Sequence, residues 1–406
     1  MFAEGARKLA KGERPRLSDL LLTPANATRV TDQLSKLRGA AMKLGQMISM
    51  DAGDVLPPEL TAILARLRNS AHFMPTAQLN KVLIAEWGAD WRRKFSHFET
   101  TPIAAASIGQ VHRATLRDGT VLAIKVQYPG VADSIEADVD NVASLLRISN
   151  LLPTTLDISL LLVEAKKQLC EEADYVREAS QMQLYKKLLA DDPNFLVPTT
   201  YAPLSTQRVL AMDFIPGQSI EILDAKPQKT RDSAMSALLG LVLRELFEFG
   251  YMQTDPNFAN YRWQEESGKI VLLDFGAARP VPDETVDAYR RLMRAGLDSN
   301  CDVLRDTLID AGFISPMAMQ RHKPALDAMI KILMSHLGKP GLFDFADRSF
   351  VDKLRKQVET IATDRNSWHI PPADTLFVQR KVSGTALLAI RMKSKLPLRD
   401  MVEKIL

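Results

Sequence analysis

Residues 255–260 read Asp-Pro-Asn-Phe-Ala-Asn, and residues 274–276 read Asp-Phe-Gly. Asp255 and Asn260 are five residues apart, and Asp274 follows at the end of a short apolar run. Carboxylate and amide oxygens are the hard donors that Mg²⁺ prefers, and Mg²⁺ takes few protein ligands when phosphate groups supply the others. The pattern predicts that Asn260 and Asp274 hold Mg²⁺. It also predicts that Asp255 is either a catalytic base or the carboxylate that positions an attacking water.

A lysine on a predicted strand adds a contact for phosphate. Residues 121–128 read Val-Leu-Ala-Ile-Lys-Val-Gln-Tyr and predict a strand, which forms a hairpin with the strand predicted over 108–116. Lys125 in this strand offers a compact positive charge to the α- and β-phosphates of a nucleotide. Glu172, in the helical stretch that follows, is the predicted carboxylate that orients Lys125.

Small residues precede this hairpin. Residues 104–110 read Ala-Ala-Ala-Ser-Ile-Gly-Gln between two predicted strand ends, where small side chains let backbone N–H groups approach phosphate oxygens. Backbone atoms of a further predicted strand, 208–214, are expected to contact adenine. The residues expected to contact the nucleotide are Ala104, Ala105, Ala106, Ser107, Lys125, Met212 and Phe214. The alanine Cβ atoms stiffen the loop relative to a glycine-rich one, so we expect the loop to disfavour phosphoryl transfer to a protein.

Each of these patterns is weak when it is taken singly. Asp-Phe-Gly is most often a turn, and a lysine on a strand is most often solvated. Their order and spacing on the expected elements together predict the nucleotide site of a kinase-like protein.

From about residue 30 to residue 395, the chain resembles the UbiB-like, AarF-type family of atypical kinase-like proteins. Within it, the chain is most similar to the coenzyme Q biosynthesis kinase-like ATPases. The stretches that carry the resemblance are Lys43-Leu-Gly-Gln46, the alanine-rich loop, Glu172-Ala-Asp174 and Gln253-Thr-Asp-Pro-Asn-Phe-Ala-Asn260. The resemblance implies a bilobal, protein-kinase-like α+β fold with an N-terminal helical extension over the active cleft. It also implies a regulatory role for Lys43, Gln46 and Asp174, in which Glu172 or Asp174 is the partner of Lys43.

The expected organisation follows from periodicity and from proline and glycine positions. Residues 1–95 are assigned to the helical extension, 96–215 to an N-lobe with a helical insert, and 216–406 to a mostly helical C-lobe. Pro216-Gly217 is the expected linker. Helices are predicted over 30–50, 59–67 and 76–87, and from 133 to 190 with an interruption near Leu152-Pro153. Beyond Ser233 the chain is predicted to be mostly helical, except for a strand over 269–276.

Composition excludes several classes of protein. The 52 Lys and Arg residues nearly balance the 49 Asp and Glu residues, which argues against nucleic-acid binding. The 2 cysteines cannot form a disulfide framework, so a reducing compartment is expected. No apolar run is long enough to span a bilayer, and residues 1–17 lack the apolar region of a secretory signal.

We therefore expect Mg²⁺-dependent binding and hydrolysis of ATP. The resemblance adds a role in ubiquinone biosynthesis at a membrane surface, with a quinone-precursor lipid or the enzymes of that pathway as partners. The expected location is the cytoplasm, with peripheral contact on the inner face of the cell membrane, for which Arg290, Arg291 and Arg294 offer a basic helix face. Two alternatives stay open: a phosphotransferase acting on a protein or small molecule, and a nucleotide-gated scaffold with negligible turnover.

Overall fold

The computed structural model describes residues 73–148, 159–362, 364 and 371–406 of the chain. The predicted helices over 30–50 and 59–67, together with Lys43 and Gln46, lie outside the described residues.

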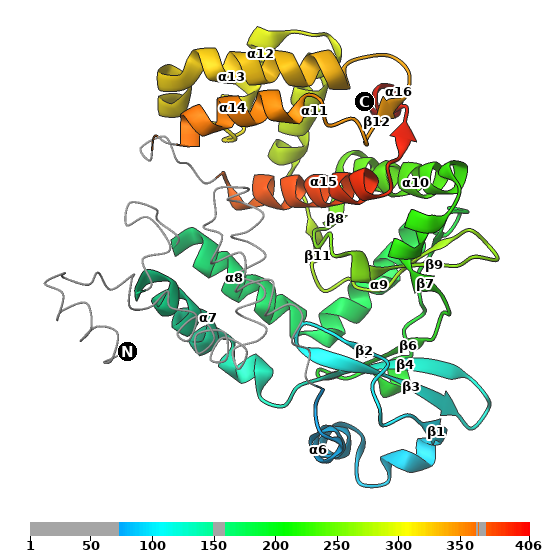
Figure 1. Cartoon of the computed structure of the whole chain (residues 1–406). Coiled ribbons are helices and arrows are strands. Elements are labelled where there is room, and N and C mark those ends of the chain that lie inside the picture. The colour runs from blue at the N-terminus through cyan, green and yellow to red at the C-terminus, as the bar shows by residue number, and fades with distance from the viewer. Residues whose placement is uncertain (1–72, 149–158, 363, 365–370) are drawn as a thin grey trace, which may run out of the picture. The chain divides into compact units, whose positions relative to one another are not determined.

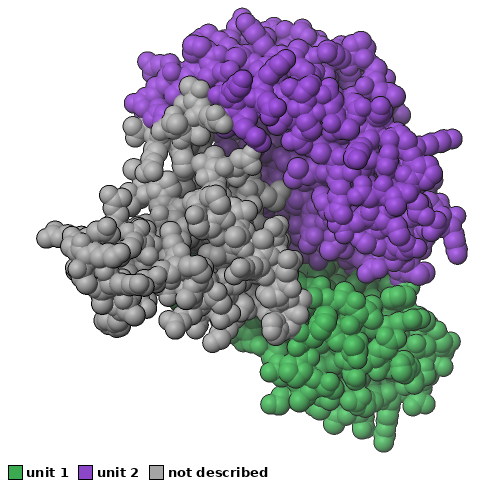
Figure 2. Space-filling view, in the orientation of Figure 1, with its two compact units in different colours: residues 1–179, 200–214 green, residues 180–199, 215–406 purple. Residues whose placement is uncertain are grey.

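The chain divides into two compact units (Figure 2). Unit 1 comprises residues 1–179 and 200–214, and unit 2 comprises residues 180–199 and 215–406. Residues 180–199 belong to unit 2 because β5 (Phe195–Leu196) pairs in parallel with β10 (Ile270–Leu272).

Unit 1 is built on an antiparallel sheet. Its strands follow the order β1 (Phe95–Phe98), β3 (Gly109–Leu116), β4 (Val121–Gln127) and β6 (Val209–Asp213), with β2 (Ala104–Ala105) paired to β3 (Figure 1). The predicted hairpin is confirmed, because β3 and β4 pair from Gly109–Gln127 to Thr115–Val121. Gly119 at its turn has φ of +91°, a conformation that favours glycine.

The two faces of β4 have different partners. Leu122, Ile124 and Val126 are fully buried in an apolar cluster that includes Leu79 and Leu83 of helix α6 (Thr76–Trp87). Side chains alternate along a strand, so Lys125 and its neighbours at even spacing point to the opposite face. The alternating direction of side chains along β4 therefore places Lys125 on the face opposite this apolar cluster.

Helices follow this hairpin, as predicted. They are α7 (Val131–Ile148), α8 (Ser159–Glu172) and α9 (Tyr175–Leu188). The sequence reading did not locate the break between α8 and α9. There Asp174 precedes α9 and its Oδ1 accepts a hydrogen bond of 2.9 Å from the Arg177 N–H, which is the geometry of an N-cap.

Unit 2 is mostly helical, as expected. Its helices are α10 (Gln228–Phe247), α11 (Asp283–Leu297), α12 (Cys301–Asp310), α13 (Pro316–Leu337), α14 (Val351–Ala362), α15 (Ala373–Arg391) and α16 (Leu398–Ile405). An apolar core joins α10, α11 and α15 through Val242, Leu246, Tyr289 and Val378. Helix α10 thus packs against α15, and this pair forms the base on which the site of unit 2 is built (Figure 1).

Short strands in unit 2 were missed from the sequence. They are β5, β7 (Gln218–Ser219), β8 (Tyr251–Gln253), β9 (Tyr261–Trp263), β11 (Ala278–Pro280), β12 (Phe343–Asp344) and β13 (Lys395–Leu396). The strand predicted over 269–276 is shorter than expected, since β10 ends at Leu272. Strands of two or three residues are too short to show an alternating pattern, and long-range pairing decides them.

Candidate nucleotide and catalytic site

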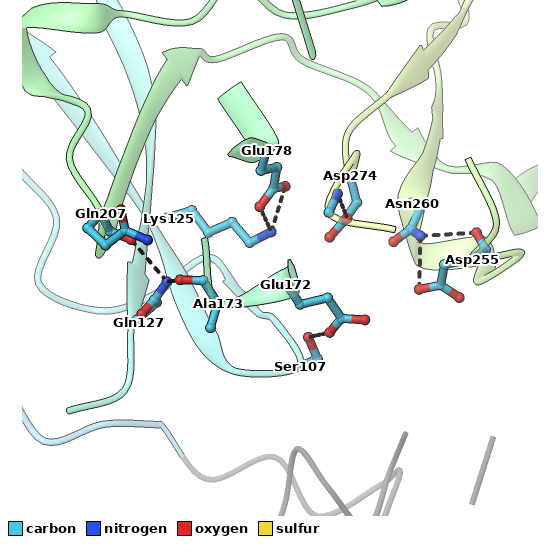
Figure 3. A network of polar contacts seen from close by, with 11 residues as sticks. Ser107, Lys125, Gln127, Glu172, Ala173, Glu178, Gln207, Asp255, Asn260 and Asp274 are labelled. Carbon is cyan, nitrogen blue, oxygen red and sulfur yellow. Dashed lines mark hydrogen bonds and ion pairs between the residues drawn. The ribbon is translucent and has the colours of Figure 1, made fainter. Parts of the chain in front are cut away.

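Lys125 forms a buried ion pair within unit 1. Its Nζ lies 2.8 and 2.9 Å from the two carboxylate oxygens of Glu178 (Figure 3). Lys125 is 7% exposed and Glu178 is 0% exposed. The Tyr175 ring, with its centroid 5.0 Å from Nζ, adds a cation–π contact. The ammonium of Lys125 is therefore held in one place by α9.

Glu178, rather than Glu172, lies on Lys125, which corrects the prediction. Glu172 is the last residue of α8, and its Oε2 accepts a hydrogen bond of 2.9 Å from Ser107 Oγ. Glu178 lies in the first turn of α9, beyond the break at Asp174. The sequence predicts one helical stretch across this region, and its periodicity does not separate the two glutamates. An aspartate followed by a helical run is an N-cap signal, and it would have pointed to Glu178.

A second polar contact docks the start of α9 onto the same face of β4. The Nε2 of Gln127 donates hydrogen bonds of 2.6 Å to the Ala173 carbonyl and 3.2 Å to the Gln207 carbonyl (Figure 3). Gln127 lies two residues after Lys125, on the same side of the strand. Consequently β4 positions both the lysine and the helix that carries its partner.

The alanine-rich segment forms the tip of a hairpin. Ala104 and Ala105 pair with β3, and the Ala106 N–H donates a hydrogen bond of 2.9 Å to the Gly109 carbonyl. A Cβ at Gly109 would lie 2.3 Å from a main-chain oxygen of β4, so only glycine fits there. Ser107 in this turn is bound by Glu172, as described above. Nucleotide contact by Ala104, Ala105, Ala106 and Ser107 stays a prediction.

The predicted adenine contacts lie at the end of β6. Met212 is buried, and the Phe214 N–H donates a hydrogen bond of 3.1 Å to the Val121 carbonyl. The Arg113 guanidinium lies 4.9 Å from the centroid of the Phe214 ring. The Phe214 N–H therefore extends the hydrogen bonding between β6 and β4. Adenine contact by Met212 and Phe214 stays a prediction.

The loop from Asp255 to Asn260 is ordered by its own side chains. Asn260 Nδ2 lies 3.4 Å from both Oδ2 and the carbonyl oxygen of Asp255. The Asn257 N–H donates to Asp255 Oδ1 at 3.3 Å, and Asn257 Oδ1 accepts from the Ala259 N–H at 3.1 Å. These long contacts orient the Asp255 carboxylate without burying it.

A hairpin missed from the sequence brings Asn260 and Asp274 to the same end of one structure. Tyr261 at the start of β9 pairs with Leu272 at the end of β10. Asn260 precedes β9, Asp274 follows β10, and the Leu273 N–H donates a hydrogen bond of 3.0 Å to the Asn260 carbonyl. The two predicted metal ligands thus flank the same pair of strands.

The donor set at this end of the hairpin fits Mg²⁺. Asn260 directs its Nδ2 to Asp255, so its amide oxygen faces away from that carboxylate (Figure 3). Asp274 Oδ1 accepts a hydrogen bond of 3.0 Å from the Gly276 N–H. The buried Phe275 packs on Tyr185, with 4.9 Å between the centroids of the two rings, and so anchors the turn. One carboxylate and one amide oxygen are hard ligands of the kind that Mg²⁺ takes together with phosphate and water.

An antiparallel sheet that carries a lysine held by a helical glutamate, and a helical unit that presents an Asp–Asn–Asp set, define the class of protein-kinase-like α+β enzymes. This confirms the predicted fold class, whereas residues 1–72 of the expected helical extension lie outside the described part of the chain. The family model of the ABC1 atypical kinase-like domain matches residues 66–307. The chain belongs to the ABC1 atypical kinase-like family.

Individual relatives agree with this assignment. The mitochondrial atypical kinase COQ8 of Saccharomyces cerevisiae is 38% identical over 96% of this chain and 78% of its own length. The mitochondrial atypical kinase COQ8B of Rattus norvegicus is 39% identical over 95% of this chain and 73% of its own length. A solved structure, described as a complex of Rv3197 with erythromycin from Mycobacterium tuberculosis, has a TM-score of 0.60 at 24% identity, covering 99% of this chain and 98% of the other. That likeness supports the fold.

Proposed function

We propose that this chain binds Mg²⁺-ATP and hydrolyses it, and that this activity supports ubiquinone biosynthesis at a membrane surface. The observation that carries the nucleotide part is the buried Lys125–Glu178 pair in a member of an atypical kinase family. In the kinase-like class, such a pair aligns the phosphates of a nucleotide for the metal and catalytic groups of the other lobe.

The roles of the side chains follow from their chemistry. Lys125 would contact the α- and β-phosphates, and Asn260 and Asp274 would hold Mg²⁺, which neutralises charge on the phosphates. Asp255 would orient a water for attack or accept its proton. The Glu172–Ser107 hydrogen bond would hold the alanine-rich turn in place.

The biosynthetic part of the proposal comes from the relatives named above and from the motifs that this chain shares with the coenzyme Q branch. A quinone-precursor lipid, or the enzymes that modify it, would be the partner. The proposed location is a membrane surface, and the two relatives described above are mitochondrial. In the part of the chain that the structure describes, no helix is long and apolar enough to cross a membrane.

The basic helix face expected to contact lipid is partly neutralised. Arg290 Nη1 lies 2.7 Å from Asp287, and Arg291 Nη1 lies 3.8 Å from Asp310. Arg294 Nη2 donates a hydrogen bond of 3.0 Å to the Leu406 carbonyl. The two ion pairs lower the positive charge that α11 offers to an anionic surface.

Phosphate release from ATP, measured with and without vesicles, tests the proposal. The vesicles contain phosphatidylcholine, either alone or with an anionic phospholipid. Asp274→Asn removes the carboxylate proposed to bind Mg²⁺. The matched control is Asp287→Asn, which makes the same change at an exposed position of α11. We expect vesicles to stimulate turnover in the wild type and in Asp287→Asn, and we expect Asp274→Asn to lack turnover.

Other results select the alternatives. Transfer of labelled phosphate to an added protein or small molecule would favour a phosphotransferase. Tight binding of Mg²⁺-ATP without release of phosphate would favour a nucleotide-gated scaffold. Equal turnover in Asp274→Asn and the wild type would refute the metal assignment.

A further inference from the structure

Helix α15 lies directly against the loop that carries Asp255. A Cβ built on Gly384 would lie 2.2 Å from Cβ and 2.5 Å from Cγ of Pro256. Since these distances are far shorter than a normal contact, the helix backbone itself touches the residue next to Asp255. The absence of a side chain at Gly384 allows this approach.

One helical turn earlier, Lys381 joins the two ends of the same loop. Its Nζ donates hydrogen bonds of 3.1 Å to Gln253 Oε1 and 3.0 Å to the Tyr261 hydroxyl. Gln253 is the last residue of β8, and Tyr261 is the first residue of β9. A single ammonium thus bridges the point where the chain enters the loop and the point where it leaves.

Glu245 of α10 completes a buried charge cluster beneath the loop. Its Oε1 accepts hydrogen bonds from the Tyr185 hydroxyl at 2.7 Å and from the Gln253 N–H at 3.1 Å. Its Oε2 lies 3.6 Å from Lys381 Nζ. Glu245 is 0% exposed and Lys381 is 2% exposed.

The cluster is not explained by stability alone. Burying two charges costs several kcal/mol per ion, and apolar replacements of a buried ion pair are often as stable or more stable. Here Lys381 donates its hydrogen bonds to Gln253 and Tyr261, which flank the loop. The charge therefore lies where it can fix the two ends of the loop backbone.

The ammonium is charged in this setting. Burial acts to lower the pKa of Lys381, but the Glu245 carboxylate and the Tyr261 hydroxyl raise it above its usual range, and the Asp255 carboxylate adds to this effect. Burial raises the pKa of Glu245, against the opposing effects of Lys381 and the Tyr185 hydroxyl. The groups that face Lys381 thus come from α10, β8, β9 and the loop itself.

We propose that Lys381 is a positioning residue, which acts from α15 by holding both ends of the Asp255–Asn260 loop. The consequence for turnover rests on the proposed function, whereas the tether to the loop does not. Gly384 contributes to this positioning, because the absence of its side chain brings α15 close enough for Lys381 to reach Gln253 and Tyr261.

Hydrogen–deuterium exchange of the full chain without nucleotide tests the tether. The variant combines Lys381→Met with Glu245→Gln, so that neither charge is left buried alone and the acceptor for the Gln253 N–H is kept. The matched control is Tyr289→Phe, which removes a buried hydrogen bond of 3.2 Å to the Thr375 carbonyl of α15, away from the loop. We expect exchange of residues 253–261 to rise about 10-fold in the double variant and to stay at the wild-type rate in the control.

Steady-state kinetics tests the consequence. We expect the double variant to lower kcat for ATP hydrolysis about 10- to 100-fold while KM for Mg²⁺-ATP changes less than about 3-fold, because misplacement of a catalytic group acts on the chemical step.

The tether and the proposed ATP hydrolysis can be refuted separately. Wild-type exchange at residues 253–261 in the double variant would refute the tether, and so would an equal rise of exchange over all of unit 2. An absence of ATP hydrolysis in the wild type would refute the proposed function, and the exchange measurement would still decide the role of Lys381.

Discussion

Replacing the two glutamates near Lys125 distinguishes the structural assignment from the sequence prediction. Glu178→Ala removes a 0% exposed carboxylate from an ammonium that is itself 7% exposed. Breaking a buried ion pair by deleting one partner costs about 3–5 kcal/mol. Glu172 is half-buried, and the hydrogen bond that it accepts from Ser107, which Glu172→Ala removes, is worth about 1 kcal/mol. We expect the free energies of unfolding of the two variants to differ by about 2–4 kcal/mol.

A double-mutant cycle makes this comparison specific to Lys125. Each glutamate variant is combined with Lys125→Met, and urea unfolding yields the coupling energy of each pair. We expect a coupling of about 1–3 kcal/mol for Lys125 with Glu178 and a coupling near zero for Lys125 with Glu172. An equal or larger coupling to Glu172 would show that the reasoning about α9 is wrong.

Four further substitutions test other parts of the fold. Gly384→Ala should lower the free energy of unfolding in urea by about 1–3 kcal/mol, because its Cβ would collide with Pro256, whereas Gly240→Ala in α10 has open space and should raise it by up to about 1 kcal/mol. Gly109→Ala should destabilise unit 1 by about 1–3 kcal/mol, since its Cβ would lie 2.3 Å from a main-chain oxygen; urea unfolding at wild-type stability would contradict this. Burial lowers the pKa of His112 below 6.5, so the folded imidazole binds fewer protons than the unfolded one, and stability should fall as the pH drops below about 6.5. His112→Gln should lessen this loss between pH 7.5 and 5.5 in urea titrations, and an unchanged slope would count against it.

Sequence reasoning found the parts of the site whose geometry depends on near neighbours. The two strands around Lys125 are joined by a short turn at Arg117-Asp-Gly-Thr120, so their hairpin was predictable from the sequence. The spacing of Asp255 and Asn260 was likewise visible, because one short loop carries both. The choice of Glu172 failed because a helix break at Asp174 changes which glutamate reaches the sheet.

The other misses share a physical cause. Strands β8, β9 and β11 have three residues each, and they form by pairing with other short strands, as in the pairing of Gln253 in β8 with Ala278 in β11. Lys381 lies 128 residues from Gln253 in sequence, and the sequence of its helix does not identify this partner. A charged residue within a buried helical run is a signal that something must compensate it, but the signal does not say what.

By itself, the sequence determined the order of the chemical groups, the class of fold and the local elements that present Lys125 and Asp255. These properties depend on residue type and on spacings of a few positions, which hydrophobic periodicity and turn chemistry express directly. Only the tertiary structure decided that Glu178 holds the lysine, that a hairpin joins Asn260 to Asp274, and that Lys381 bridges the two ends of the Asp255–Asn260 loop. Each of these contacts depends on how packed elements orient side chains that are distant in sequence, and the burial that makes them strong exists only once the chain has folded.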